Sequence, residues 1–166
     1  LPPLVSIIHG ILAQTFFIMT IIIAYSMSQE RENRIDNGMG QSIQKGALLM
    51  GGLVYIQLIL GALMRHTASG LAIPDFPTMG GMWIPTFSSE MMENINYILF
   101  DLDLDSVSKG QVIIHFIHRL GAVIITGTIG YFYAKYGETI IASQRSKAVF
   151  ISIIAIVIIQ FSLGVL

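Results

Sequence analysis

The sequence predicts an all-α membrane protein built from four transmembrane helices. Of its 166 residues, 54% are hydrophobic and only 11% are charged, a balance far from that of a soluble domain. In addition, four stretches contain no Asp, Glu, Lys or Arg, and a span needs about 20 apolar residues. These stretches are 4–27, 46–64, 120–134 and 148–166. We therefore expect a single transmembrane domain over residues 1–166, with little room for a soluble domain.

The first, second and fourth spans are long enough by themselves, whereas the third has a polar beginning. His115, His118 and Arg119 lie in its first two turns if the helix starts at about residue 111. Leu, Val, Ile and Gly then continue as far as Ala134. We therefore expect the third transmembrane helix over 111–134.

Basic residues gather in two connectors, and acidic residues gather in the third. The basic residues of connectors 28–46 and 135–147 are Arg31, Arg34, Lys45, Lys135, Arg145 and Lys147. Loop 65–110 instead holds six carboxylates against Arg65 and Lys109. Because cytoplasmic loops carry an excess of Lys and Arg, we expect the two basic connectors in the cytoplasm and the acidic loop outside. A net charge of −1 gives no indication of nucleic-acid binding.

Loop 65–110 is long but conformationally restricted. Its prolines and glycines limit a connector that would otherwise be too long to stay ordered. Within it, residues 90–102 place apolar side chains on one helical face, which predicts a short interfacial helix lying on the membrane. Those side chains are Met91, Met92, Ile95, Ile98, Leu99 and Leu102. Two roles are open for the loop: a lid over an outer site, or an ordered crossing with no ligand role.

Two segments of the predicted helices resemble each other. "VYIQLILGAL" at 54–63 and "VIIQFSLGVL" at 157–166 match at six of ten positions. The shared polar and small residues are Gln57 with Gln160, and Gly61 with Gly164. Ile, Leu and Gly dominate such helices, so chance similarity is one explanation, and an internal repeat is the other. A repeat predicts one further helix after the last span, and the start of the sequence, without Met or a basic segment, indicates the middle of a longer protein.

All four histidines are predicted to lie in one layer of the membrane, near its outer side. They are His9, His66, His115 and His118. Ionisable groups inside a membrane are costly and usually face the bundle interior with a partner. Each histidine could form a hydrogen bond with a neighbouring carbonyl, but four at one depth, with none in the cytoplasmic half, favour a cofactor.

Haem suits these residues better than zinc does. Zinc requires three or four ligands, and the predicted helices supply no acidic or thiol side chain to help. Haem needs only one or two axial imidazoles, an apolar slot and cations for its propionates. We predict His9 and His118 as the iron ligands, with Gly10 and Gly121 allowing the macrocycle to approach the backbone.

Three cations are placed toward the surface, where haem propionates would lie. We predict that Arg65, His66 and Arg119 bind the cofactor there, although Arg119 could instead extend to lipid headgroups. His115 and His118 share a helix face one turn apart, so both cannot bind the same side of one iron. We predict a catalytic role for His115 as hydrogen-bond donor or proton shuttle. The alternative is a polar residue facing the wet outer end.

Three segments closely resemble the haem A synthase family. They are "HGILAQTFF" at 9–17, "QLILGALMRHTASGLAIPDFP" at 57–77 and "IHFIHRLGA" at 114–122. The resemblance implies part of an eight-helix protein made of two similar four-helix halves, with the four helices here similar to the family's fourth to seventh. It also implies oxidation of a methyl group of haem O to the formyl group of haem A, with haem b as cofactor. His9 would be the axial ligand of the first half and His118 that of the second.

The sequence departs from the family pattern at three points. Many members have cysteines where this chain has Ile73 and Met79, and the other half of the family's proteins has a carboxylate at the position of His115. The helices that would carry the partners of His9 and His118 are also absent.

Two functions therefore follow from the resemblance. The first is a haem-binding oxidoreductase of the haem A synthase type. The alternative is a non-catalytic haem-binding subunit for electron transfer or assembly of a respiratory complex. The implied partners are haem, the lipid bilayer, haem O synthase, terminal oxidase subunits, or a chain that supplies the missing helices. We expect the protein in the bacterial cytoplasmic membrane or the mitochondrial inner membrane, with the haem site on the outer side.

Overall fold

The computed structural model describes residues 3–32 and 41–165, and all regular structure in these ranges is helical. The helices are α1 (Pro3–Ser26), α2 (Gln29–Glu32), α3 (Gln41–His66), α4 (Ser89–Asp101), α5 (Lys109–Ala142) and α6 (Gln144–Val165). Four of them, α1, α3, α5 and α6, are long and apolar enough to cross a membrane. The prediction of an all-α membrane protein with four spans is therefore confirmed. Arg34, one of the predicted cytoplasmic residues, lies outside the described residues.

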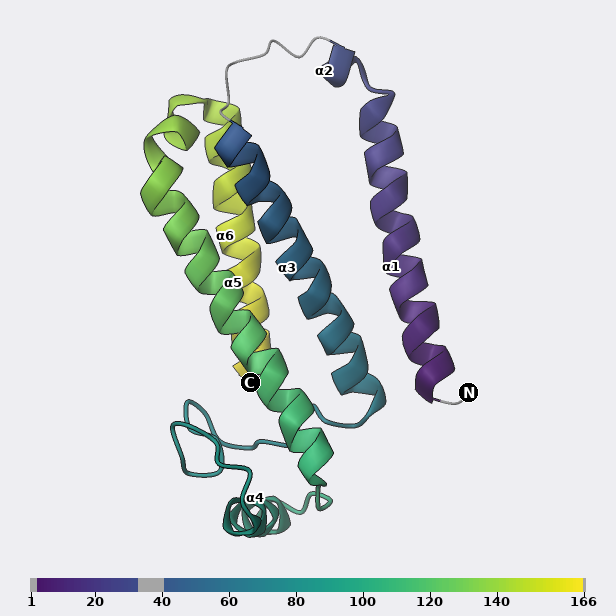
Figure 1. The fold of residues 1–166 in the computed structure, drawn as a ribbon, viewed down its shortest axis with the longest axis vertical. Helices are drawn as coiled ribbons and strands as arrows, with labels where there is room; N and C mark the ends of the chain where they lie inside the picture. The colour runs from purple at the N-terminus through teal and green to yellow at the C-terminus, as the bar shows by residue number, and fades with distance from the viewer. Residues whose placement is uncertain (1–2, 33–40, 166) are drawn as a thin grey trace.

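The long helices pack in sequence, each against the next. α1 packs against α3, α3 against α5, and α5 against α6. Successive long helices run in opposite directions, and α4 lies at the end where α3 finishes and α5 begins (Figure 1). We call this the loop end, and we call the opposite end, where α3 begins and α5 finishes, the connector end. All of the predicted site residues come from the loop-end part of α1, α3 and α5.

α5 is the central helix of the described part of the chain. It has 34 residues and extends beyond the predicted 111–134 in both directions. Its beginning is fixed by a capping box, in which the Ser108 side chain accepts from the Gln111 backbone and the Gln111 side chain accepts from the Ser108 N–H. In its most apolar window 22% of the residues are buried, against none for α1 and α3. The other long helices therefore present most of their apolar side chains outward, as helices in lipid do.

The loop end has its own apolar core, made by α4, the loop and the start of α5. This loop-end cluster consists of Ala72, Ile73, Met91, Ile95, Leu99 and Val112. Gly80 makes the close packing possible, because its φ is +63° and a Cβ there would crowd Ile95 and Met91 at 3.0–3.2 Å. Three residues of the predicted membrane-facing side of α4 are thus covered by the protein's own loop. The sequence pattern predicted the helix correctly, but the contacts of the apolar face of α4 depend on how the loop folds.

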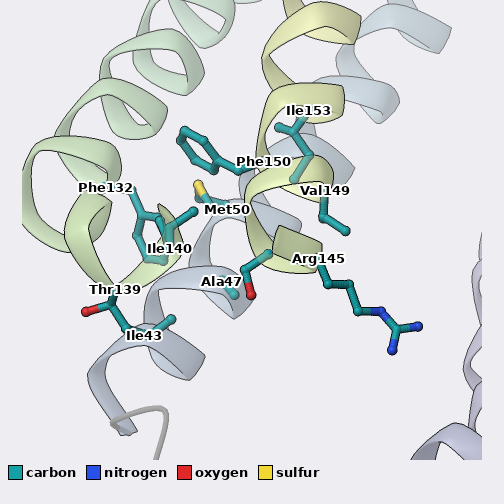
Figure 2. A pocket seen from close by; sticks show the side chains of 11 residues that line it. Ile43, Ala47, Met50, Phe132, Thr139, Ile140, Arg145, Val149, Phe150 and Ile153 are labelled. Carbon is teal, nitrogen blue, oxygen red and sulfur yellow. The ribbon is translucent and has the colours of Figure 1, made fainter. Parts of the chain in front are cut away.

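The connector end has a second apolar core between α3, α5 and α6. Its buried residues are Ile129, Phe132, Ile140 and Phe150. Beside them lies a groove of about 310 Å³. Figure 2 shows Met50 and Phe150 near the aromatic ring of Phe132 in this groove, with the guanidinium of Arg145 pointing away from it. This end holds the helices together and contains none of the predicted site residues.

Candidate functional site

His118 lies at the crossing of α3 and α5, opposite Gln57. The Gln57 side chain donates from Nε2 to the backbone carbonyl of His118 at 2.9 Å. The same nitrogen lies 3.3 Å from Nδ1 and 3.3 Å from Nε2 of the His118 ring. The His118 side chain is half-buried. A glutamine from one transmembrane helix thus contacts both the backbone and the ring of a histidine on the next.

The equal distances show where the amide lies relative to the imidazole. The in-plane lone-pair directions of the two ring nitrogens diverge, so one donor cannot lie along both. An in-plane position between them would collide with Cε1. The Gln57 amide nitrogen therefore lies over the face of the ring, a weak N–H···π contact. No other described polar group forms a hydrogen bond with either His118 nitrogen.

Gly121 makes this close approach possible. A Cβ at Gly121 would overlap Oε1 of Gln57, whereas a Cβ at Gly61 would lie in ordinary van der Waals contact with Cε1 of His118, at 3.4 Å. The space at Gly121 that was predicted for a macrocycle is occupied in this structure by the Gln57 side chain. Gln57 Oε1 is buried there without a hydrogen-bond partner in the described structure. By contrast, a Cβ at Gly10 would meet nothing within 4 Å.

His115 connects α5 to the loop rather than to an open site. Its side chain is only 5% exposed. Nδ1 accepts from the backbone N–H of Ile73 at 3.2 Å, and Nε2 faces the Nε–H of Arg119 at 3.1 Å. A neutral imidazole has one acceptor nitrogen and one N–H, so the ring is surrounded by more donors than it can satisfy. Two donors and the Arg119 charge face the ring, while the Ser69 carbonyl lies near it as an acceptor, and these contacts join His115 to the loop. The proton-shuttle role of His115 stays a prediction.

Arg119 joins α5 to the folded loop through several backbone carbonyls. Its guanidinium donates to the carbonyl oxygens of Ile73 at 2.9 Å, Asp75 at 2.8 Å and Thr78 at 3.3 Å. It also lies over the ring of Phe76, 5.8 Å from the centroid. With Nε directed at His115, four of its five N–H groups are used. The structure thus makes Arg119 a clamp on the loop, and its predicted contact with a propionate or a lipid headgroup stays a prediction.

Asp75 closes the same loop through its side chain. Its carboxylate accepts from the backbone N–H groups of Gly80 at 2.7 Å and Gly81 at 2.9 Å. Burial alone would raise the pKa of Asp75, but hydrogen bonds from the Thr78 side chain and the two glycine N–H groups outweigh it and hold the pKa below its usual value. The loop is therefore stabilised by two side chains, the Asp75 carboxylate within the loop and the Arg119 guanidinium from α5.

The other predicted residues do not join this group. His9 is exposed on α1, which packs against α3 and makes no comparable contact with α5. Arg65 is exposed and His66 half-buried at the end of α3. The side chains of His9, Arg65 and His66 form no hydrogen bond with other described residues. The structure therefore brings together His115, His118 and Arg119 but leaves His9, Arg65 and His66 apart.

Sequence reasoning missed Gln57 as a site residue, although it identified Gln57 as part of the repeat. An uncharged polar side chain inside a transmembrane helix often bonds to a neighbouring helix, and this could have directed attention to it. The clamp formed by Arg119 was also missed. Its partners are backbone carbonyls, which every residue has, so the identities of the side chains do not indicate them.

Comparison with known proteins places this arrangement in a family. The family model COX15-CtaA, described as cytochrome oxidase assembly protein, matches residues 2–166. The chain belongs to this family. The resemblance to haem A synthases that the sequence motifs indicated is therefore confirmed. No solved structure gives a significant match.

Curated relatives carry the name heme A synthase. That of Orientia tsutsugamushi (strain Boryong) is 28% identical over 131 residues, covering 75% of this chain and 34% of the relative. Heme A synthase COX15 of Mus musculus is 28% identical over 116 residues, covering 69% of this chain and 25% of the relative. That of Rickettsia bellii (strain RML369-C) is 39% identical over 70 residues, covering 42% and 18%. The chain thus spans about a third or less of the length of these relatives.

Proposed function

We propose that this chain forms part of a membrane oxidoreductase that makes haem A, as the name of its relatives indicates, and that its substrate is haem O. In that reaction a methyl group of haem O becomes the formyl group of haem A. Two observations support the proposal: membership of the family, and a half-buried histidine at a helix crossing whose ring nitrogens have no polar partner other than the Gln57 amide among the described residues. The second observation carries the assignment of the site, because an imidazole held in this way is suited to bind iron.

The residues of the chain fit a haem better than an isolated metal ion. The described residues contain no group of three or more His, Cys, Asp or Glu side chains that could hold a metal ion. Haem iron needs only one or two protein ligands, and His118 can supply one of them. When bound, a haem b supplies electron transfer, and the protein supplies position and electronic tuning.

The residues named above would each have a defined task. His118 would hold the iron, and Gln57 lies over its ring. Arg119 and His115 fix residues 73–78 of the loop against α5, and this loop would cover the site from the outer surface. Arg65 and His66, at the end of α3, would donate to the propionates. Under this proposal the loop excludes water and the basic end of α3 orients the cofactor.

His9 belongs to a different haem in this proposal. α1 lies on the side of α3, whereas His118 is held in the crossing of α3 with α5. A second ligand for the iron at His118 would come from a helix outside this sequence, on the same polypeptide or on a partner chain. The incomplete coverage of the relatives supports this assignment, and so does the internal repeat. The acidic loop and the basic connectors support an orientation with the haem site on the outer side.

The test uses single variants of the protein purified from membranes of cells that make haem O. Extracted pigments are separated, and the reduced haem spectrum is recorded. We expect haem A in the parent sample and the loss of one spectral component in His118→Ala. His9→Ala should remove a different component, and His66→Ala should only weaken or shift the spectrum. Haem b without any haem A would support the non-catalytic electron-transfer alternative, and an unchanged spectrum in His118→Ala would overturn the ligand assignment.

A further inference from the structure

We propose that Gln57 is the positioning residue for His118, fixing the plane of the imidazole so that a ring nitrogen is presented to iron. This inference rests on the proposed function, because it requires His118 to be a haem ligand. It goes beyond that function by assigning a role to an uncharged residue that binds neither iron nor substrate.

The first step is the orientation of the Gln57 amide. The atom 2.9 Å from the His118 carbonyl must be the amide nitrogen, because an amide oxygen there would face another oxygen. With one hydrogen donated to this carbonyl, the –NH₂ group also lies 3.3 Å from each ring nitrogen. The backbone bond therefore anchors the amide, and the anchored amide bounds one face of the ring.

The second step is the restriction of the ring from one face. Rotation of the imidazole about its Cβ–Cγ bond would move the ring against the Gln57 amide. Gly61 sets no such limit, because even an added Cβ there would lie in ordinary van der Waals contact with Cε1, at 3.4 Å. Iron-binding histidines usually have a partner that fixes the ring orientation. Among the described residues, Gln57 is the side chain that can take this part for His118.

The third step is the cost of having a glutamine at this position. Gln57 Oε1 is buried against Gly121 with no hydrogen-bond partner in the described residues, and a buried unpaired acceptor destabilises a structure. A methionine or leucine would occupy similar space without this cost. The N–H contacts to His118 are the interactions that offset it, which ties the identity of residue 57 to the histidine.

The experiment compares Gln57→Met with Gln44→Met, a control on the same helix. Gln44 is exposed near the beginning of α3, at the connector end. The first measurement is the low-temperature electron paramagnetic resonance spectrum of the oxidised protein, which depends on the orientation of axial imidazoles. The second is the fraction of reduced haem that binds carbon monoxide, which requires release of an axial ligand. Methionine is similar in length to glutamine but has no N–H donor.

We expect Gln57→Met to retain its haem but to shift and broaden the signal of the component that His118→Ala removes. We also expect the carbon monoxide-binding fraction to rise about fivefold, the effect of losing one net hydrogen bond. Gln44→Met should match the parent protein in both measurements. If Gln57→Met does not fold, Gln57→Glu, which also lacks the N–H donors, is subject to the same criteria.

The outcomes separate this inference from the proposed function. Loss of a haem component in His118→Ala, together with parental spectra in Gln57→Met, would overturn the positioning role of Gln57 alone. An unchanged spectrum in His118→Ala would overturn both. Equal changes in Gln57→Met and Gln44→Met would also overturn the inference, because they would indicate a general effect of removing a glutamine.

Discussion

The two similar glutamine–glycine segments have different surroundings. In α3, Gln57 contacts His118 and fills the space left by Gly121. In α6, the Gln160 side chain is exposed, and a Cβ at Gly164 would meet no described atom within 4 Å. The same pattern therefore builds a site in one helix and only an outward-facing surface in the other.

This difference shows what the pattern requires from its partner. A glutamine becomes part of a site when the facing helix supplies both a group to contact and a small residue that lets the two backbones approach. α5 supplies both, three residues apart, as His118 and Gly121. The loop that Arg119 clamps follows α3 in sequence, and it also contacts the α6 segment, where Phe76 packs edge-to-face on Phe161 with ring centroids 6.0 Å apart.

The largest expected effect is that of removing the Arg119 clamp on the loop that follows α3. Arg119→Ala removes the donor of four hydrogen bonds, and bonds to charged groups are worth about 1.5–3 kcal/mol each. We expect hydrogen–deuterium exchange in residues 69–81 to become at least about tenfold faster in detergent-solubilised protein. Arg119→Lys should be intermediate, because an ammonium cannot reach the same carbonyls as a planar guanidinium. Parental exchange in Arg119→Ala would contradict the clamp.

A somewhat smaller effect is expected from filling the space at the helix crossing. Gly121→Leu should displace the Gln57 side chain and force α3 from α5, at a cost of about 1–3 kcal/mol. Thermal unfolding in detergent measures the loss of stability. The matched variant Gly164→Leu should unfold at the parental temperature, because its surroundings are open. Equal destabilisation by the two variants would remove the distinction between the two copies.

A moderate effect is expected from His115→Asn, which tests whether this residue holds the loop or transfers protons. An asparagine amide can accept one of the two N–H groups that face His115, but it is too short to keep both contacts. We expect a loss of about 1 kcal/mol in loop stability, measured by exchange at residue 73, with haem A formation retained. Abolished conversion with a stable loop would instead favour the predicted catalytic role.

The smallest expected effect concerns the pH dependence of the loop. Because the pKa of Asp75 is below its usual value, its carboxylate stabilises the folded loop above the ordinary titration range of Asp, and this contribution disappears as the pH falls through the lowered pKa. The group is partly exposed, so we expect less than about 1 kcal/mol. Cleavage of the loop by pepsin between about pH 2 and 5 measures it. In Asp75→Asn this added pH dependence should be absent.

Much of the fold was predictable because the spans depend on hydropathy alone. The helix at α4 was also predictable from its apolar period. The surroundings of the buried face of α4 could not be predicted, because Gly80 and the path of the loop place Met91 and Ile95 against protein rather than lipid.

The site was less accessible from sequence than the spans. The common depth of the histidines was predicted from their positions along the helices, and this prediction identified His118 as a candidate site residue. The partners of Arg119 are carbonyl groups whose positions exist only in the folded loop. Gln57 was visible as a repeated residue, but its contact with His118 depends on the relative rotation of two helices, which periodicity does not determine.

The length of α5 has a consequence for how the protein sits in bilayers of different thickness. Its 34 residues extend about 51 Å, whereas the 24 residues of α1 extend about 36 Å, and the hydrocarbon core is about 30 Å thick. A thicker membrane is therefore accommodated by α5 without exposing its ends, and hydrophobic mismatch acts mainly on α1, which is held only through α3. Changes in helix tilt should then move His9 relative to His118 while the α3–α5 crossing stays unchanged. Membrane thickness would thereby alter the distance between His9 and His118, the two proposed iron ligands, and not the contact between His118 and Gln57.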